Sequence, residues 1–186
     1  MTIKEKTCCF TGHREIPAHL YPALTKALEE TLRGLIRQGV LYYGAGGALG
    51  FDTLAARTVL RLREEMPQIR LILVLPCPQQ DRYWNLQDQK IYRDIMNRAD
   101  KVVFLSPNYT RGCMHRRNRH LVDCSSVCVA YCIKPSGGTA YTVAYAKQKG
   151  LSVINLAGRL SNENKAPDGE SSLPGGFSMK LMVYSP

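Results

Sequence analysis

Short apolar runs alternate with longer amphipathic segments along most of the chain. The apolar runs are of strand length and cover residues 7–11, 40–43, 69–75, 101–105, 127–132 and 151–156. The segments between them carry apolar residues at helical spacing and predict helices at residues 21–38, 51–65, 81–99, 114–123 and 139–149. This alternation predicts an α/β fold: a Rossmann-like, doubly wound and mostly parallel sheet with helices on both faces.

The alternation stops near Gly158. Residues 162–176 are rich in Gly, Pro, Ser and charged residues, a composition that buries too little apolar surface to offset the entropy of ordering. Residues 177–184 regain some apolar character and are candidates for docking on the sheet or on a neighbour. We therefore expect a Rossmann-like domain at residues 1–157 and a polar, flexible C-terminal tail at residues 158–186.

Length and composition are those of one globular domain. The chain has 186 residues, of which 45% are hydrophobic, enough for a sizeable core. No apolar run is long enough to span a bilayer, and the first residues lack the apolar core of a signal peptide. We expect a cytoplasmic protein with no membrane segment.

The seven cysteines predict neither disulfides nor a metal site. Their number is odd, and Cys8, Cys9 and Cys128 lie within predicted strands, where reduced thiols act as small apolar side chains. There is no Cys-x-x-Cys pair. Cys128 and Cys132 would lie about 13 Å apart along one strand, too far to share an ion.

Three predicted strands end in glycine-containing turns. Glycine lets the backbone approach a phosphate closely, and the start of a helix adds unpaired N–H groups with a partial positive charge. Turns that follow parallel strands emerge at one edge of the sheet, so these three can share one crevice. The turn residues that we expect to bind a nucleotide or another phosphate ligand are Thr11, Gly12, His13, Arg14, Gly46, Gly47, Gly50, Asp52, Ser136, Gly137, Gly138 and Thr139.

Five polar side chains near this edge are candidates for specific roles. Asp52 either caps its helix, binds a ribose hydroxyl or acts as a catalytic acid. His13 and Arg14 are placed to contact a phosphate, and His13 titrates near neutral pH, as a general acid or base must. The Arg117 guanidinium suits a bidentate phosphate contact, and the Asn118 amide suits a base edge.

Positive charge is concentrated in one segment. The net charge is +10, and residues 111–120, from Arg111 to His120, hold four arginines and two histidines. This field favours an anionic partner, although a run of charge is also typical of a solvated helix face. The run lacks the interleaved aromatic residues of single-strand binders, so nucleic acid ranks below a small nucleotide as the partner.

Four motifs in order resemble the YpsA-like branch of the SLOG superfamily, which also contains DprA and the LOG phosphoribohydrolases. They are Thr11-Gly12-His13-Arg14, residues 46–52, the segment from Cys113 to Asn118, and residues 136–141. The resemblance runs from about residue 7 to residue 156. It implies a Rossmann-like domain that senses or processes a nucleotide-derived ligand and often self-associates, so we expect a homo-oligomer.

One position departs from the related enzymes. LOG-type enzymes carry a catalytic glutamate on the helix after their glycine-rich turn, and deoxyribosyltransferases carry a nucleophilic glutamate three residues after Gly-Thr. Here Thr142 stands at that place, and a threonine carries no negative charge with which to stabilise an oxocarbenium-like centre. Ligand binding or sensing is therefore the first hypothesis. A hydrolase or transferase that uses Asp52 and a DprA-like nucleic-acid binder are the alternatives.

Overall fold

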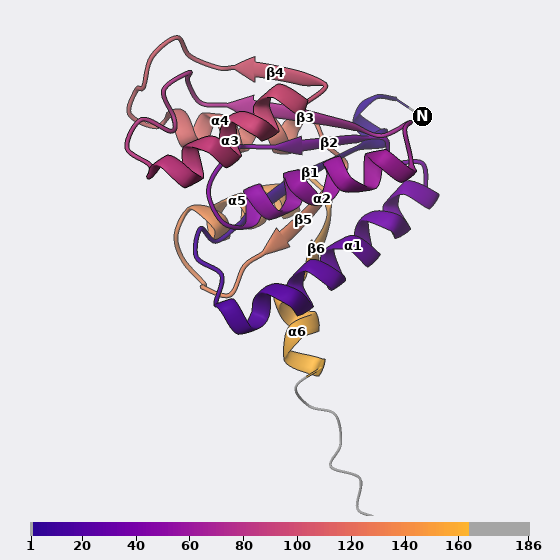
Figure 1. Cartoon of the computed structure of the whole chain (residues 1–186). Coiled ribbons are helices and arrows are strands. Elements are labelled where there is room, and N and C mark those ends of the chain that lie inside the picture. Colours follow the sequence, from indigo (N-terminus) through magenta and orange to yellow (C-terminus); the bar gives the residue numbers. More distant parts are fainter. Residues whose placement is uncertain (1, 164–186) are drawn as a thin grey trace, which may run out of the picture.

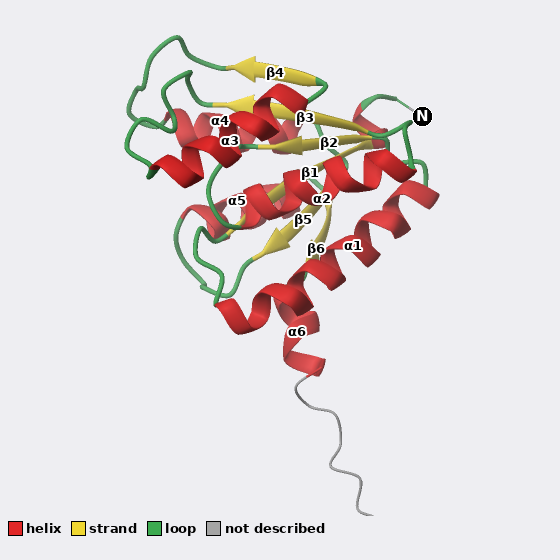
Figure 2. Ribbon diagram, viewed as in Figure 1, coloured by secondary structure: helices red, strands yellow, loops and turns green. Residues whose placement is uncertain are grey.

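The computed structural model describes residues 2–163, in which six parallel strands form one sheet in the order β4-β3-β2-β1-β5-β6 (Figures 1 and 2). The strands are β1 (Thr7–Gly12), β2 (Tyr42–Ala45), β3 (Arg70–Leu75), β4 (Lys101–Phe104), β5 (Val127–Tyr131) and β6 (Ser152–Asn155). The helices are α1 (Tyr21–Arg37), α2 (Phe51–Glu65), α3 (Leu86–Arg98), α4 (Cys113–Asp123), α5 (Gly138–Gln148) and α6 (Ala157–Glu163), with short 3-10 helices at Lys4–Lys6 and Ala18–Leu20. The predicted fold class is confirmed. The apolar segment 177–184 lies outside the described residues.

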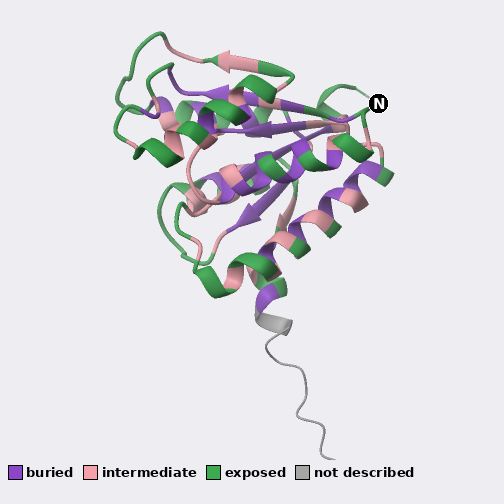
Figure 3. Ribbon diagram, viewed as in Figure 1, coloured by how far each residue is buried: buried purple, intermediate pink, exposed green. Residues whose placement is uncertain are grey.

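Helices cover the two faces of the sheet unequally. Helices α1, α2, α3 and α6 lie on one face, and α4 and α5 lie on the other (Figure 1). Strand residues alternate between these layers: Cys8 and Phe10 pack with α1 and α2, whereas Cys9 packs with α4 and α5. The central strands are consequently buried on both sides (Figure 3), which explains their continuously apolar sequences.

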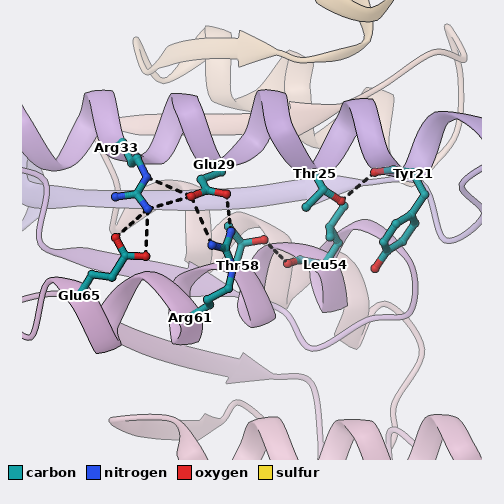
Figure 4. Close-up of polar contacts among 8 residues, drawn as sticks. All are labelled: Tyr21, Thr25, Glu29, Arg33, Leu54, Thr58, Arg61 and Glu65. Carbon is teal, nitrogen blue, oxygen red and sulfur yellow. Dashed lines mark hydrogen bonds and ion pairs between the residues drawn. The ribbon is translucent and has the colours of Figure 1, made fainter.

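Helices α1 and α2 pack through apolar stripes and are joined at their outer surface by ion pairs. Leu24, Leu28 and Leu32 of α1 are fully buried. Outside this stripe, the Glu29 carboxylate pairs with the Arg33 guanidinium at 2.8 Å and also with Arg61 of α2 (Figure 4). These pairs are partly exposed, so each adds little to the stability.

Two elements differ from the sequence expectation. Helix α3 begins at Leu86 rather than near residue 81, because Asn85 caps it by accepting a hydrogen bond from the Asp88 N–H at 2.9 Å. Helix α6 follows β6 directly, and its Leu160 is buried in the α1 side of the core. A helix of seven residues shows too little periodicity to be predicted from its sequence.

The order of the strands creates a switch point beside β1. The chain runs from β1 through β2 and β3 to β4, and then returns to place β5 on the other side of β1. The connection after β1 leads to α1 on one face, and the connection after β5 leads to α5 on the opposite face. Such a divergence leaves a crevice outside the carboxyl ends of the two strands, which is where open α/β sheets bind ligands.

Candidate functional site

A cavity of about 320 Å³ lies at this switch point. Nine of the predicted residues line it: Thr11, Gly12, His13, Arg14, Asp52, Arg117, Asn118, Gly138 and Thr139. Phe10, Ala48 and Met114 also line it and were not predicted. Gly46, Gly47, Gly50, Ser136 and Gly137 do not line it. The crevice therefore gathers residues from β1 and the loop after it, from the turn before α2 and the first turn of α2, from α4 and from the start of α5.

Glycines in the first two turns are required by packing within the protein. A Cβ at Gly46 would overlap the Arg117 guanidinium, and a Cβ at Gly12 would overlap the Phe51 side chain. Gly50 has a φ of 75°, which favours glycine, and its Cβ would overlap the main chain of Arg14. The absence of a Cβ at these three glycines lets the turns after β1 and β2 pack closely against each other and against Arg117.

The third turn differs, because Gly137 and Gly138 have open space where a Cβ would stand. Gly138 begins α5 at the cavity wall, and the first turn of this helix contains no acidic residue. Open space next to a helix N-terminus suits close approach of an anion to backbone N–H groups.

A buried ion pair forms the floor of the crevice. The Asp52 Oδ2 atom lies 3.9 Å from the Arg117 Nη1 atom and accepts hydrogen bonds from the backbone N–H groups of Gly46 at 3.1 Å and Ala48 at 3.4 Å. Arg117 Nη1 donates to the Gly46 carbonyl oxygen. Burial raises the pKa of Asp52 above its usual value, against the opposing effects of Arg117 and the two N–H groups. Asp52 and Arg117 thus fasten the β2–α2 turn to α4.

A hydrogen-bonded relay continues from this pair to α5. Arg117 Nε donates to Asn118 Oδ1 at 2.7 Å, and Asn118 Nδ2 donates to Thr142 Oγ1 at 2.9 Å. Thr142 Oγ1 in turn donates to the Gly138 carbonyl oxygen at 2.8 Å. Thr142 is buried, so the position that carries glutamate in the related enzymes here holds α4 against the start of α5.

His13 joins the β1–α1 loop to the β5–α5 loop. Its Nε2 atom accepts hydrogen bonds from the backbone N–H groups of Ile133 at 2.9 Å and Lys134 at 3.2 Å. An imidazole nitrogen that accepts is unprotonated. Burial, and then the nearby charge of Lys134, lower the pKa of His13. The Nε2 atom is therefore already engaged in hydrogen bonds within the protein.

Most of the basic run lies in α4, which begins at Cys113, and its arginines differ in burial. Arg117 is buried in the crevice, whereas Arg111, Arg116 and Arg119 are exposed. Tyr141 of α5 lies edge-on to His115 with ring centroids 5.0 Å apart. The basic run itself contains no Phe, Tyr or Trp, and α5 places the Tyr141 ring next to it.

The cysteines form no cluster around this site. All seven are free thiols, and Cys8, Cys9 and Cys128 are buried in their strands. Within residues 2–163, no three His, Cys, Asp or Glu side chains lie close enough together to hold a metal ion. None of the helices described is long and apolar enough to cross a membrane.

Comparison with known proteins relates the chain to curated relatives and to solved structures. The chain is 29% identical to a UPF0398 protein of Halalkalibacterium halodurans over 154 residues, which are 77% of this chain and 82% of that protein. It is 28% identical to the SPbeta prophage-derived protein YoqJ of Bacillus subtilis, over 55% of this chain and 67% of that protein.

Two solved structures share the fold at low sequence identity. DNA processing protein A from Helicobacter pylori, described for its single-stranded DNA binding mode, has a TM-score of 0.56 at 17% identity, over 87% of this chain and 74% of that one. DNA processing protein A from Streptococcus pneumoniae has a TM-score of 0.58 at 16% identity, over 81% of this chain and 50% of that one. The family model described as the YspA SLOG family matches residues 9–153. With that match over most of its length, the chain belongs to the YpsA family of SLOG proteins.

Proposed function

We propose that the protein binds a nucleotide or a nucleotide-derived phosphate ligand in the crevice at the switch point. The observation that carries this proposal is the cavity of about 320 Å³ between the β1–α1 loop, the Asp52–Arg117 pair and the start of α5. Its volume is within the range of small-molecule sites, and its place in the fold is the usual one for ligands of open α/β sheets.

The charges around the cavity favour an anion. Arg117 is paired with Asp52, so the buried floor is close to neutral. Arg14 also lines the cavity, and its charge acts on both members of this pair. Among the described residues, none makes a hydrogen bond or an ion pair with the Arg14 side chain. Arg14 and the N-terminus of α5 therefore provide positive charge at the cavity, next to an Asp52 carboxylate that is already paired with Arg117.

Introducing a negative charge at Thr139 tests the proposal. Thr139 lines the cavity in the first turn of α5, where a carboxylate is compatible with the helix dipole. Thr139→Asp should keep the fold and weaken the binding of adenosine monophosphate at least tenfold by isothermal titration calorimetry, because its charge repels the phosphate. Thr139→Asn, of the same size and uncharged, is the matched control and should bind within about threefold of the natural protein. Equal affinities for the two variants would refute an anion site at this helix.

Single-stranded nucleic acid is a second candidate partner. The H. pylori neighbour is described as a single-stranded DNA binder. In this chain, exposed aromatic side chains accompany exposed arginines near the carboxyl edge: Tyr141 lies against His115 of the basic helix, and the Arg82 guanidinium lies 5.3 Å from the Tyr83 ring centroid. Aromatic rings on which bases stack, next to cations that follow the phosphates, are the features of single-strand binders.

This second candidate predicts a stacking contribution at one tyrosine. Tyr141→Ala should weaken the binding of oligo(dT) by about five- to tenfold in fluorescence anisotropy, within the range measured for base stacking. Tyr21→Ala is the matched control, because Tyr21 has nearly the same exposure, 40% against 41% for Tyr141, and belongs to α1 on the other face of the sheet. Equal effects of the two substitutions, or binding that does not weaken with salt, would remove this candidate.

The enzymatic alternative depends on Asp52. Its Oδ2 atom is engaged by two backbone N–H groups and by Arg117, which favours a role in holding the turn. The natural protein should accordingly release no free base from nucleoside monophosphates. Base release that is lost in Asp52→Asn would make Asp52 catalytic. Self-association stays a prediction, and light scattering of the purified protein measures it.

A further inference from the structure

A cavity of about 360 Å³ lies between α4 and the part of the sheet formed by β2, β3 and β4, and we call it the sheet groove. Its lining includes Ile72, Val74, Lys101, Val103, His120 and Leu121. The first residues of β1, β2 and β4 also line it, whereas the crevice lies at the carboxyl ends of the strands. The sheet groove and the crevice share no lining residue, so the proposed function does not account for the sheet groove.

The sheet groove exists because the helices on this face cover the sheet incompletely. Among the described residues, α4 and α5 are the helices on this face; α5 packs on β5 and β6, and α4 packs on β1 and β3. Strand β4 stays partly exposed, unlike the central strands (Figure 3). Parallel sheets are generally covered on both faces, and an exposed apolar area often marks a binding site.

The floor and the wall of the sheet groove are apolar. Ile72 and Val74 of β3 belong to the core on the α4 side. Val103 of β4 is the register partner of Val74, so its side chain faces the same way. Leu121 of α4 forms the wall. An aliphatic chain in the sheet groove would therefore bury its surface against two strands and one helix.

Positive charge stands at the rim of the sheet groove. Lys101, the first residue of β4, lines the groove and is exposed. In the described part of the chain, no hydrogen bond or ion pair engages its ammonium group. His120 of α4 lines the groove as well, and none of the lining residues is acidic. The rim is thus complementary to a ligand that ends in an anion.

The Cys124 thiol lies at the same rim and can report whether the groove is filled. Its Sγ atom lies 3.7 Å from the Nε2 atom of His120. Burial, and then the nearby Asp123 carboxylate, raise the pKa of Cys124 above its usual value, whereas Lys4 lowers it. A protonated thiol adds to the apolar lining. Cys124 is nevertheless exposed, so a thiol reagent can reach it.

We infer that the sheet groove binds a medium-chain fatty acid, whose alkyl chain lies on the β3–β4 floor against Leu121 and whose carboxylate pairs with the Lys101 ammonium group. The apolar floor by itself accepts any aliphatic chain, and the unpaired cation selects one with a terminal carboxylate. The volume is near the lower end of the range for small-molecule sites, which favours a chain of about eight to ten carbons over a long one.

Calorimetry with hexanoate, octanoate and decanoate tests the apolar part of the site. Each buried methylene should raise the affinity by about threefold, so octanoate should bind about tenfold more tightly than hexanoate. Val103→Thr keeps the shape of the side chain and places a hydroxyl on the floor, which should weaken decanoate binding by about threefold or more. Val153→Thr is the matched control, because Val153 is a partly buried valine of edge strand β6 on the same face and does not line the groove.

A charge variant tests the carboxylate contact. Lys101→Gln should weaken decanoate binding by about fivefold or more and leave the binding of 1-decanol, which has no carboxylate, within about twofold. Lys90→Gln is the matched control, since Lys90 is an exposed lysine of α3 on the other face of the sheet. It should leave the affinity for decanoate unchanged.

Thiol labelling locates the ligand. Saturating decanoate should slow the reaction of Cys124 with a maleimide by about fivefold or more and leave the rate at Cys132 unchanged, because Cys132 does not line the groove. Affinity that does not rise with chain length, equal effects of Lys101→Gln and Lys90→Gln, or a Cys124 that decanoate does not protect would each overturn the inference. Adenosine monophosphate should not protect Cys124, so failure of nucleotide binding and failure of fatty-acid binding are separate results.

Discussion

Replacing Arg117 by methionine removes one member of the buried ion pair and keeps most of the side-chain volume. Arg117 and Asp52 are both buried, and Arg117 also donates to the Gly46 carbonyl oxygen and to Asn118. The substitution leaves a buried carboxylate without its counter-charge and Asn118 Oδ1 without its Arg117 donor, whereas the Gly46 carbonyl oxygen keeps a donor in Gln80 Nε2 at 3.4 Å. Asp52 retains its two backbone N–H donors.

The size of the expected loss in unfolding free energy follows from these contacts. Removing one partner of a buried pair destabilises proteins by about 3–5 kcal/mol. The separation of 3.9 Å is long for an ion pair, and two N–H groups still solvate Asp52, so we expect a value near the lower end, about 3 kcal/mol. For a domain of this size, that loss lowers Tm by roughly 6–12 °C.

The pH dependence separates loss of charge pairing from loss of packing. Burial already places the pKa of Asp52 in the folded protein above its usual value of 3.8, and removing Arg117 raises this pKa further. As pH falls, the folded variant takes up the proton before the unfolded chain does, so its stability rises relative to that of the natural protein. The difference in unfolding free energy should therefore shrink as pH falls from 7 toward 4.

Urea denaturation across this pH range measures the effect. Arg116→Met is the control, because Arg116 is exposed on the same helix and, within residues 2–163, its side chain bonds only to the Thr110 hydroxyl, at 2.9 Å. It should change the unfolding free energy by no more than about 0.5 kcal/mol. A loss in Arg117→Met that is the same at pH 7 and pH 4, or no larger than that of the control, would refute the assignment of a charged pair.

Three further predictions concern the loops and the start of α5. The pKa of His13 is lowered in the folded protein, so the unfolded chain binds the proton first as pH falls. The unfolding free energy of the natural protein, measured by urea denaturation, should therefore decline as pH falls below 6.5. His13→Ala should not show this decline. Gly50→Ala should destabilise by more than about 2 kcal/mol, since it combines a φ of 75° with an overlap on the Arg14 main chain. Gly138→Ala, in open space, should stay within about 1 kcal/mol of the natural protein by the same measurement.

The fold could be predicted from the sequence because the pattern that indicates each element lies within one segment. Helical spacing within α1 and the continuous apolar run of β3 each lie inside one segment, and parallel pairing follows from their alternation. Local signals fail where an element is short, as with α6, or where a cap decides the boundary. The Asn85 cap moves the start of α3 to Leu86, although the amphipathic pattern continues upstream.

The site was accessible only in part, because its contacts join distant positions. The sequence placed Asp52 and Arg117 near one edge, yet the bond from Arg117 to Gly46 spans 71 positions and the bond from His13 to Ile133 spans 120. Of the four arginines in the basic run, the sequence analysis selected Arg117, and Arg117 is the buried one. Gly46 was read as a ligand-facing glycine, whereas the Arg117 guanidinium fills the space beside it.

The threonine at position 142 and the charge at the rim of the crevice have a common explanation. The relay from Asp52 through Arg117 and Asn118 to Thr142 ends in a neutral hydroxyl, so one anion and one cation balance within it. A glutamate at this buried position would add a second carboxylate that Arg117 cannot also neutralise, and an uncompensated buried charge is strongly destabilising. Because the floor is neutral as it stands, the positive charge available to a ligand comes from Arg14 at the rim and from the start of α5. That arrangement favours holding an anion over stabilising the cationic centre of a glycosidic cleavage.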